Sequence, residues 1–332
     1  MTQQNTCHNA PKTDTATRIR VGISSCLLGN SVRFDGGDKH NSYVTHTLNN
    51  YFDFQAFCPE VEAGMSIPRP PIHLVRDNNV IYLKEVKNWQ KDHTQRLADF
   101  CDTIHNRIIP LCGFILKKDS PSCGMERVKV FDKHHPKSPP MRVGTGVFAA
   151  YLKQHYPLLP LEDEGRLNDP VLRENFIERV FIYHRWHDLT NKGMTKHQLI
   201  NFHADHKYIT MAHSPAEAKK LGQLVAEAGL RDFAEIKDEY ITRLMNLLQV
   251  RVSRGRHANV LSHLMGYIHN ELSSDDRAEL VETITQYQQG YVPLIVPITL
   301  LKHHFRKHPK PYIERQHYLN PHPSELMLRN QL

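Results

Sequence analysis

The sequence predicts an α/β domain with a mostly parallel sheet, followed by an all-α domain. In the first half, short β-branched runs alternate with segments of helical periodicity, as is typical of β-α-β units. In the second half, apolar residues recur almost only at helical spacing. The chain has 332 residues, which is the length of two ordinary domains.

The first half contains three clear strand candidates and three helix candidates. The strands are predicted at Arg18–Ser25, Phe52–Phe57 and Gly113–Lys117. Shorter extended segments are expected at Leu74–Val75, Val80–Leu83 and Arg127–Phe131, and helices at Asn41–Tyr51, Trp89–Pro110 and Gly144–Tyr156. Because strands and helices alternate, most of the strands should lie parallel to one another.

Composition changes near the middle of the chain. Residues 157–168 are rich in proline and charge, as is typical of a linker or an interdomain extension. Beyond them, Ser214, Pro215 and Glu217 have the spacing of an N-cap, a first helical residue and a capping-box partner. The sequence therefore predicts a disordered leader at 1–17, a domain at 18–160 and a helical domain at 161–332.

Charge and hydropathy limit the classes of function. No run approaches the roughly 20 apolar residues of a membrane span, and the polar N-terminal segment lacks the apolar core of a signal peptide. We therefore expect a cytoplasmic protein with no membrane partner. The formal net charge of +7 permits a nucleic-acid partner without requiring one.

Three of the six cysteines share a setting. Cys26, Cys58 and Cys123 each follow one of the predicted strands. Because the carboxyl ends of parallel strands meet at one edge of a sheet, these thiols can meet in space. Three thiolates suit a soft metal centre, and on a four-iron cluster they would leave one iron open.

The alternative is that these cysteines are unrelated core residues, since free cysteine is often buried. Cys101 and Cys112 lie in and after the helix predicted at 89–110 and are expected in the core, while Cys7 in the leader is expected to be inert. No C-x-x-C pair occurs, and without an export signal a disulfide framework is not expected.

The cysteine blocks resemble the thiouracil desulfidase family. The segments that carry this resemblance are GISSCLLG with VRFDGG, FCPEVEAGM with IPRPP, and ILKKDSPSCG. The second half resembles the YbgA-like domain through FHADHKYITMAH, RGRHANVLSHLMGYIHNEL and YVPLIVPITLLKHHF. The fusion of the two is similar to the tRNA 4-thiouridine desulfidases.

This resemblance implies that the protein is an enzyme. It implies hydrolytic removal of sulfur from a thio-nucleobase on a [4Fe-4S] cluster held by Cys26, Cys58 and Cys123. The hydrolysis involves no net electron transfer, so no nicotinamide or flavin cofactor is expected. Consistent with this, the sequence has no G-x-G-x-x-G and no Walker-type phosphate loop.

Polar residues in the same blocks are candidates for catalysis. Glu60, two residues after Cys58, is the expected general base, with Glu62 as the alternative. Ser120 is the expected hydroxyl partner that positions substrate or relays a proton, with Ser122 as the alternative.

Further substrate contacts are expected from Ser24, Asp35, Arg69 and Ser122. For Asp35 the alternative is a role in organising its loop, and for Arg69 it is a structural salt bridge.

Two basic clusters in the helical half are the expected contacts with tRNA. They are Arg251, Arg254 and Arg256, and Lys302, Arg306, Lys307 and Lys310. Basic side chains interleaved with aromatic or imidazole rings suit RNA phosphates and unstacked bases, and a solvated basic face is the alternative. His203, His206 and His213 lack an H-E-x-x-H pattern and are expected to be structural or to contact RNA.

Taken together, these features predict a tRNA 4-thiouridine desulfidase that produces uridine and sulfide. Thiolated tRNA or a thio-nucleobase is therefore the expected substrate. Two alternatives remain open at this point: a desulfidase of free 4-thiouracil or thionucleosides, and a non-catalytic iron–sulfur protein that binds RNA or acts as a sensor.

Overall fold

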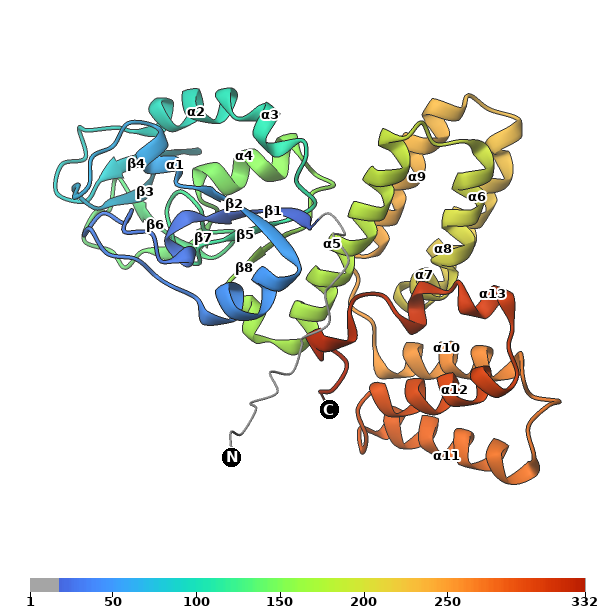
Figure 1. Ribbon diagram of the computed structural model, residues 1–332. Coiled ribbons are helices and arrows are strands. Elements are labelled where there is room, and N and C mark those ends of the chain that lie inside the picture. Colours follow the sequence, from blue (N-terminus) through green and yellow to red (C-terminus); the bar gives the residue numbers. More distant parts are fainter. Residues whose placement is uncertain (1–17, 332) are drawn as a thin grey trace, which may run out of the picture.

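The computed structural model describes residues 18–331, so the leader predicted at 1–17, with Cys7, lies outside the described residues. The chain forms an α/β region followed by a helical region that runs from α5 to α13 (Figure 1). The predicted fold class is confirmed.

The first sheet positions the cysteines. Its four strands, in the order β2-β1-β5-β8, are all parallel. They are β1 (Ile19–Ser24), β2 (Phe52–Phe57), β5 (Phe114–Leu116) and β8 (Leu161–Asp163). Because every strand runs the same way, all four carboxyl ends lie at one edge.

A second sheet lies beside the first, with the order β4-β3-β6-β7. Its strands are β3 (Ile72–Asp77), β4 (Val80–Glu85), β6 (Val128–Asp132) and β7 (Met141–Gly144). Only β3 and β6 are parallel; β3–β4 and β6–β7 are antiparallel. The extended segments predicted at Leu74–Val75, Val80–Leu83 and Arg127–Phe131 thus form a separate, mixed sheet beside the predicted parallel one.

Helices cover both faces of the first sheet. Phe114 of β5 packs in the same cluster as Phe100 and Phe148, on the side of α2 (Thr94–Thr103), α3 (His105–Ile108) and α4 (Val147–His155). The next residue, Ile115, points to the opposite face and clusters with Phe176 of α5 (Pro170–Asn191). The first helix of the helical region therefore shares a core with the sheet.

Residues 157–168 are not the linker that their composition predicted. Leu161–Asp163 form β8, which pairs with β5 at the edge of the first sheet. A strand of three residues between prolines and charges carries too little periodicity to be recognised in the sequence.

Two predicted helices are also less regular than expected. The helix predicted at Trp89–Pro110 is divided into α2 and α3 at Ile104, whose ψ of 2° leaves the helical range. The helix predicted at Asn41–Tyr51 forms a short π turn at Tyr43–Thr47 and a 3-10 turn at Leu48–Asn50.

The helical region has its own apolar core. Its remaining helices are α6 (Lys196–Asp205), α7 (Lys207–His213), α8 (Pro215–Ala226), α9 (Phe233–Leu247), α10 (Arg254–Gly266), α11 (Ser274–Gln289), α12 (Ile295–Lys307) and α13 (Pro311–Glu314). Ser214 caps α8 as predicted, since its side chain accepts the Glu217 N–H at 3.4 Å. Within residues 18–331, no helix combines the length and the apolar character that crossing a membrane requires.

The shared core makes α5 part of the packing that supports the first sheet. We expect Phe176→Ala to lower the free energy of unfolding by about 3–5 kcal/mol, the usual cost of truncating a buried Phe. Phe176 is 0% exposed, whereas Val171 on the same helix is 52% exposed and serves as the control. In urea unfolding, Val171→Ala should change stability by about 0.5 kcal/mol or less. Equal effects of the two substitutions would contradict the shared core.

Candidate active site

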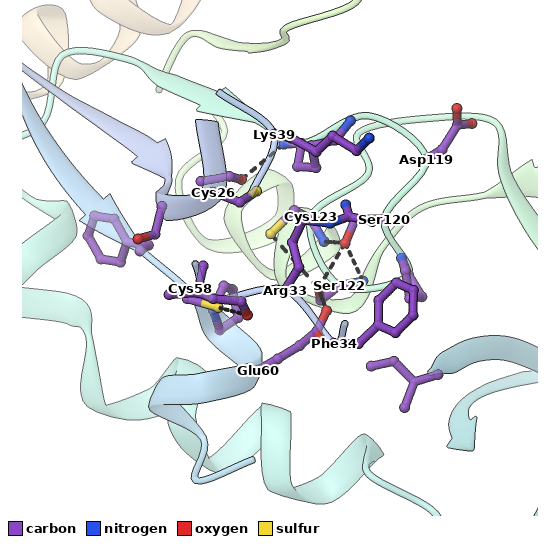
Figure 2. Close-up of a pocket in the computed structure, with 18 of the residues that line it drawn as sticks. Cys26, Arg33, Phe34, Lys39, Cys58, Glu60, Asp119, Ser120, Ser122 and Cys123 are labelled. Atoms are coloured by element: carbon purple, nitrogen blue, oxygen red, sulfur yellow. Dashed lines mark hydrogen bonds between the residues drawn. The ribbon is translucent and has the colours of Figure 1, made fainter. Parts of the chain in front are cut away.

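The three predicted cysteines converge at the carboxyl edge of the first sheet. Cys26 follows β1 in a 3-10 turn, Cys58 directly follows β2, and Cys123 lies in the loop after β5. These are three adjacent strands of the sheet. All three residues line one cavity of about 330 Å³ (Figure 2).

All three thiols are free, and burial dominates their electrostatics. Cys26 and Cys123 are 8% and 5% exposed, while Cys58 is half-buried. Burial raises the pKa of the Cys26 thiol to about 11 and also raises the pKa values of Cys58 and Cys123. Without a metal these thiols hold their protons, so a metal group that binds here must displace them.

The donor set fits a cluster better than a single ion. Among residues 18–331, no group of three or more His, Cys, Asp or Glu side chains is placed to hold one metal ion. Ligands of a single zinc ion must all reach to about 2.3 Å from one point, whereas the thiolates of an iron–sulfur cluster bind separate irons. Three thiols spread around one cavity therefore suit a polynuclear iron–sulfur group.

Cations surround the thiols. Lys39, Lys117 and Lys118 line the cavity together with Arg33. Lys117 forms an ion pair with Glu164, which also accepts the Lys118 backbone N–H at 2.6 Å. This positive surround offsets the negative charge that three thiolates would bring.

Glu164 was missed in the sequence because it follows β8, the strand whose segment was interpreted as a linker. Glu164 directly follows the fourth parallel strand, and recognising that strand in the sequence would have identified it as a candidate site residue.

A chain of hydrogen bonds leads to Glu60. Its Oε1 accepts from Ser122 Oγ at 2.6 Å, and its Oε2 accepts from Arg69 Nε at 2.9 Å and Nη2 at 2.6 Å. Ser122 Oγ lies 3.0 Å from Ser120 Oγ. Because an ionised carboxylate only accepts, Ser122 donates to Glu60 and Ser120 donates to Ser122.

The two serines hold different places in this chain of hydrogen bonds. Ser122 contacts Glu60 directly, and Ser120 contacts it through Ser122. Ser120 Oγ accepts the Cys123 backbone N–H at 3.1 Å and so holds the loop that carries this cysteine. Glu62 lies outside the cavity lining, where it accepts the Cys58 N–H at 2.9 Å and pairs with Arg107.

The other expected substrate contacts have structural partners. Ser24 lines the cavity, and its Oγ accepts the Lys117 N–H at 2.9 Å, which ties β1 to β5. Asp35 does not line the cavity. Its Oδ1 accepts the Gly37 N–H at 3.1 Å, a contact that fits the alternative role of organising its loop. Arg69 lines the cavity and orients Glu60, with a further bond to Val32 O at 3.0 Å.

Phe34 is a site residue that the sequence reasoning missed. It lines the cavity and is 38% exposed, close to Ser122 in the view of Figure 2. Exposed aromatic rings beside a cavity are the usual stacking surfaces for unpaired bases. The sequence feature that could have identified Phe34 is its place in the VRFDGG segment, directly before Asp35.

The two basic clusters of the helical region divide into engaged and free side chains. Arg256 donates to His213 O, Lys302 bonds Asn320, and Lys310 pairs with Glu271. Four exposed side chains have no hydrogen bond or ion pair to any part of the chain that the structure describes. They are Arg251, Arg254, Arg306 and Lys307. These four are available to an external anion.

The three histidines considered for metal binding have internal partners. His203 Nδ1 lies 3.3 Å from Tyr240 OH, His206 Nδ1 lies 2.7 Å from Phe202 O, and His213 Nε2 lies 2.8 Å from the buried Glu178 carboxylate. These contacts orient one nitrogen of each ring within the helical region.

Comparison with known proteins accounts for both regions. Residues 207–323 match the family described as a protein of unknown function, DUF1722. The chain is 31% identical over 153 residues to the uncharacterized protein YbgA of Escherichia coli (strain K12). The aligned segment covers 46% of this chain and 90% of YbgA. The chain belongs to the YbgA family.

The α/β region of this YbgA-family chain is similar to a second family. Residues 21–164 match the family described as 2-thiouracil desulfurase, a span that includes all three cavity cysteines and ends just after β8. Among solved structures, the [4Fe-4S]-dependent thiouracil desulfidase TudS is similar, with 26% identity, coverage of 46% of this chain and 95% of that chain, and a TM-score of 0.35. The predicted two-part resemblance is confirmed.

Proposed function

We propose that this protein removes sulfur from 4-thiouridine in tRNA by hydrolysis in the cytoplasm. The observation that supports this most is the convergence of Cys26, Cys58, Cys123 and Glu60 on one cavity. Water and a thiocarbonyl give a carbonyl and hydrogen sulfide, so atoms and electrons balance without an oxidant or a reductant.

Cys26, Cys58 and Cys123 are the proposed ligands of a [4Fe-4S] cluster. When bound, such a cluster supplies an open iron that attracts the soft sulfur of the substrate and polarises its carbon–sulfur bond. The three cysteines would hold the cluster, and the lysines that line the same cavity would offset the charge of their thiolates.

Glu60 is the proposed general base. Arg69 holds its Oε2 with two hydrogen bonds, which leaves Oε1 to act on water. Oε1 accepts one hydrogen bond from Ser122. Its second lone pair can accept from the water molecule that attacks the thiocarbonyl carbon of the nucleobase. Once Glu60 is protonated, it can donate to Ser122, and the proton can pass to Ser120 at the cavity wall.

Phe34 is the proposed stacking surface for the thio-base. Its ring is exposed beside the cavity, and Arg33 lies 5.4 Å from the ring centroid. A base stacked there would be held over the cavity that the cysteines line.

The helical region from α5 onward is the proposed tRNA-binding part. The proposed catalytic part ends after β8 rather than at residue 160, because β8 completes the first sheet. A thio-base inside tRNA must leave its stack to enter the cavity, which costs a few kcal/mol. Phosphate contacts to free cations such as Arg254 and Arg306 would offset that cost.

Replacing three of the free cations tests this division. We expect the variant Arg254→Ala, Arg306→Ala, Lys307→Ala to bind unthiolated tRNA more weakly, with a salt slope flatter by roughly 0.7–0.9 for each lost phosphate contact. Fluorescence anisotropy over a salt series measures both. A charge-matched control replaces three exposed lysines of the α/β region by Ala and should bind like the wild type. These are Lys87, Lys129 and Lys137. Equal affinities of the two variants would place the RNA surface elsewhere.

The substrate itself is tested by anaerobic incubation of the holoprotein with thiolated tRNA and, separately, with free 4-thiouracil. Nucleoside analysis should show 4-thiouridine converted to uridine in tRNA faster than the free base is consumed. Rapid turnover of free 4-thiouracil with tRNA left intact would instead support a salvage or detoxification enzyme.

A further inference from the structure

A second cavity, of about 440 Å³, lies between the α/β region and the helical region. Lys153 of α4 and Arg166 line it from one side, and Arg179 of α5 and Arg251 line it from the other. No residue lines both this cavity and the one that holds the cysteines. Its volume falls within the roughly 300–1,000 Å³ that is usual for ligand sites.

Arg179 is the unusual member of this cavity. Arg179 is half-buried as a whole, but its Nε is fully buried without a hydrogen-bond partner. No atom of its side chain has a hydrogen bond or ion pair within residues 18–331. Burial lowers the pKa of this guanidinium to about 10. By contrast, the buried Arg329 pairs with Glu174 at 2.8 Å. A cation in such a position is costly unless an anion reaches it.

The neighbouring charges do not supply that anion. Arg166 pairs with Glu162 at 2.5 Å and with Glu126 at 2.6 Å, so both of these carboxylates already have a cation. Lys153 donates only to a carbonyl, Met125 O, at 2.6 Å. Four cationic side chains therefore line the cavity with one carboxylate, Glu162, and Glu126 lies outside the lining, so the cavity carries a positive excess.

We propose that this cavity is an anion site in which Arg179 and Arg251 bind a phosphate group of the RNA backbone. The planar guanidinium suits phosphate because it can donate two parallel hydrogen bonds. That the phosphate belongs to RNA rests on the proposed function. It also rests on the position of Arg251, which lies in the segment that leads to Arg254, one of the free cations proposed to contact tRNA. A phosphate held here would fix the tRNA against both regions at once, beside the sheet whose edge carries the thiols.

Arg179→Gln is the direct test, with inorganic phosphate and unthiolated tRNA as probes. We expect the variant to bind unthiolated tRNA about tenfold more weakly, the scale of losing a charge-assisted contact. Phosphate should raise the melting temperature of the wild type but no longer that of the variant. Without phosphate, the variant should melt at the same temperature or higher, because a half-buried cation with no ion-pair partner has been removed.

Two further variants make the result decisive. Arg251→Gln changes an exposed side chain, so its folding is not in question, and it should lose the same response to phosphate and tRNA. Arg20→Gln removes an exposed charge that does not line the cavity and should behave like the wild type.

Wild-type tRNA affinity in both Arg179→Gln and Arg251→Gln would overturn the proposal. Loss of the phosphate response with tRNA affinity intact would also overturn it, in favour of a site for a free phosphate or nucleotide. Because unthiolated tRNA undergoes no desulfidation, these measurements remain valid if 4-thiouridine is not the substrate. In that case the proposed function fails and the phosphate site stands.

Discussion

Replacing Cys26, Cys58 or Cys123 by Ser is expected to remove the iron–sulfur cluster and the desulfidase activity together. Each cysteine is placed at the end of a different strand, so no neighbouring thiol can take over its corner. Serine is a harder and less acidic ligand than cysteine and binds iron poorly in this setting. Iron and acid-labile sulfide content of anaerobically purified protein measures the loss.

Cys101 and Cys112 provide the matched controls. Both are buried in apolar clusters of the α/β region, and neither lines the cavity. Cys101→Ser and Cys112→Ser should therefore retain iron and activity, apart from a moderate loss of stability. Loss of iron in either control with full iron in Cys58→Ser would show that the ligands have been assigned wrongly.

Glu60→Gln is expected to reduce kcat by about a hundredfold or more while iron content stays normal. The amide keeps the size of the side chain and can still accept from Ser122, but it cannot take a proton from water. Kinetics with thiolated tRNA at saturating concentration, together with iron analysis, separates the chemical step from cluster loss.

Glu62→Gln is the control for Glu60→Gln, since Glu62 is also a carboxylate of α1 (Pro59–Glu62) but does not line the cavity. It should retain most of the activity. The serines give a second comparison, because Ser122→Ala breaks the contact with Glu60, whereas Ser120→Ala breaks the chain one step further away. Near-normal turnover by Glu60→Gln would refute its role as the base.

The convergence of the cysteines could be predicted because it follows from a rule of topology. Once three thiols are placed after three parallel strands, the strand ends bring them together whatever the intervening loops do. The contact between Ser122 and Glu60 could not be predicted, since it depends on the loop after β5. That loop turns through Asp119, with a φ of 59°, and through Gly124, where a Cβ would lie 2.6 Å from Ser120 O.

The features that the sequence did not reveal depend on partners distant along the chain. The second sheet was missed because periodicity identifies extended segments but not the strands they pair with. Glu164 was missed because β8 has only three residues. The isolation of Arg179 is a property of the folded structure alone, because it depends on which carboxylates reach the cavity between the two regions.

The most direct test of the account is to follow the oxygen and the sulfur of one turnover in heavy-oxygen water. The anaerobic holoprotein is incubated with thiolated tRNA without added reductant, and the tRNA is digested for mass analysis. The account predicts one labelled uridine and one sulfide for each 4-thiouridine lost. Sulfide release that requires a reductant, or uridine that carries no label, would contradict hydrolysis at this site.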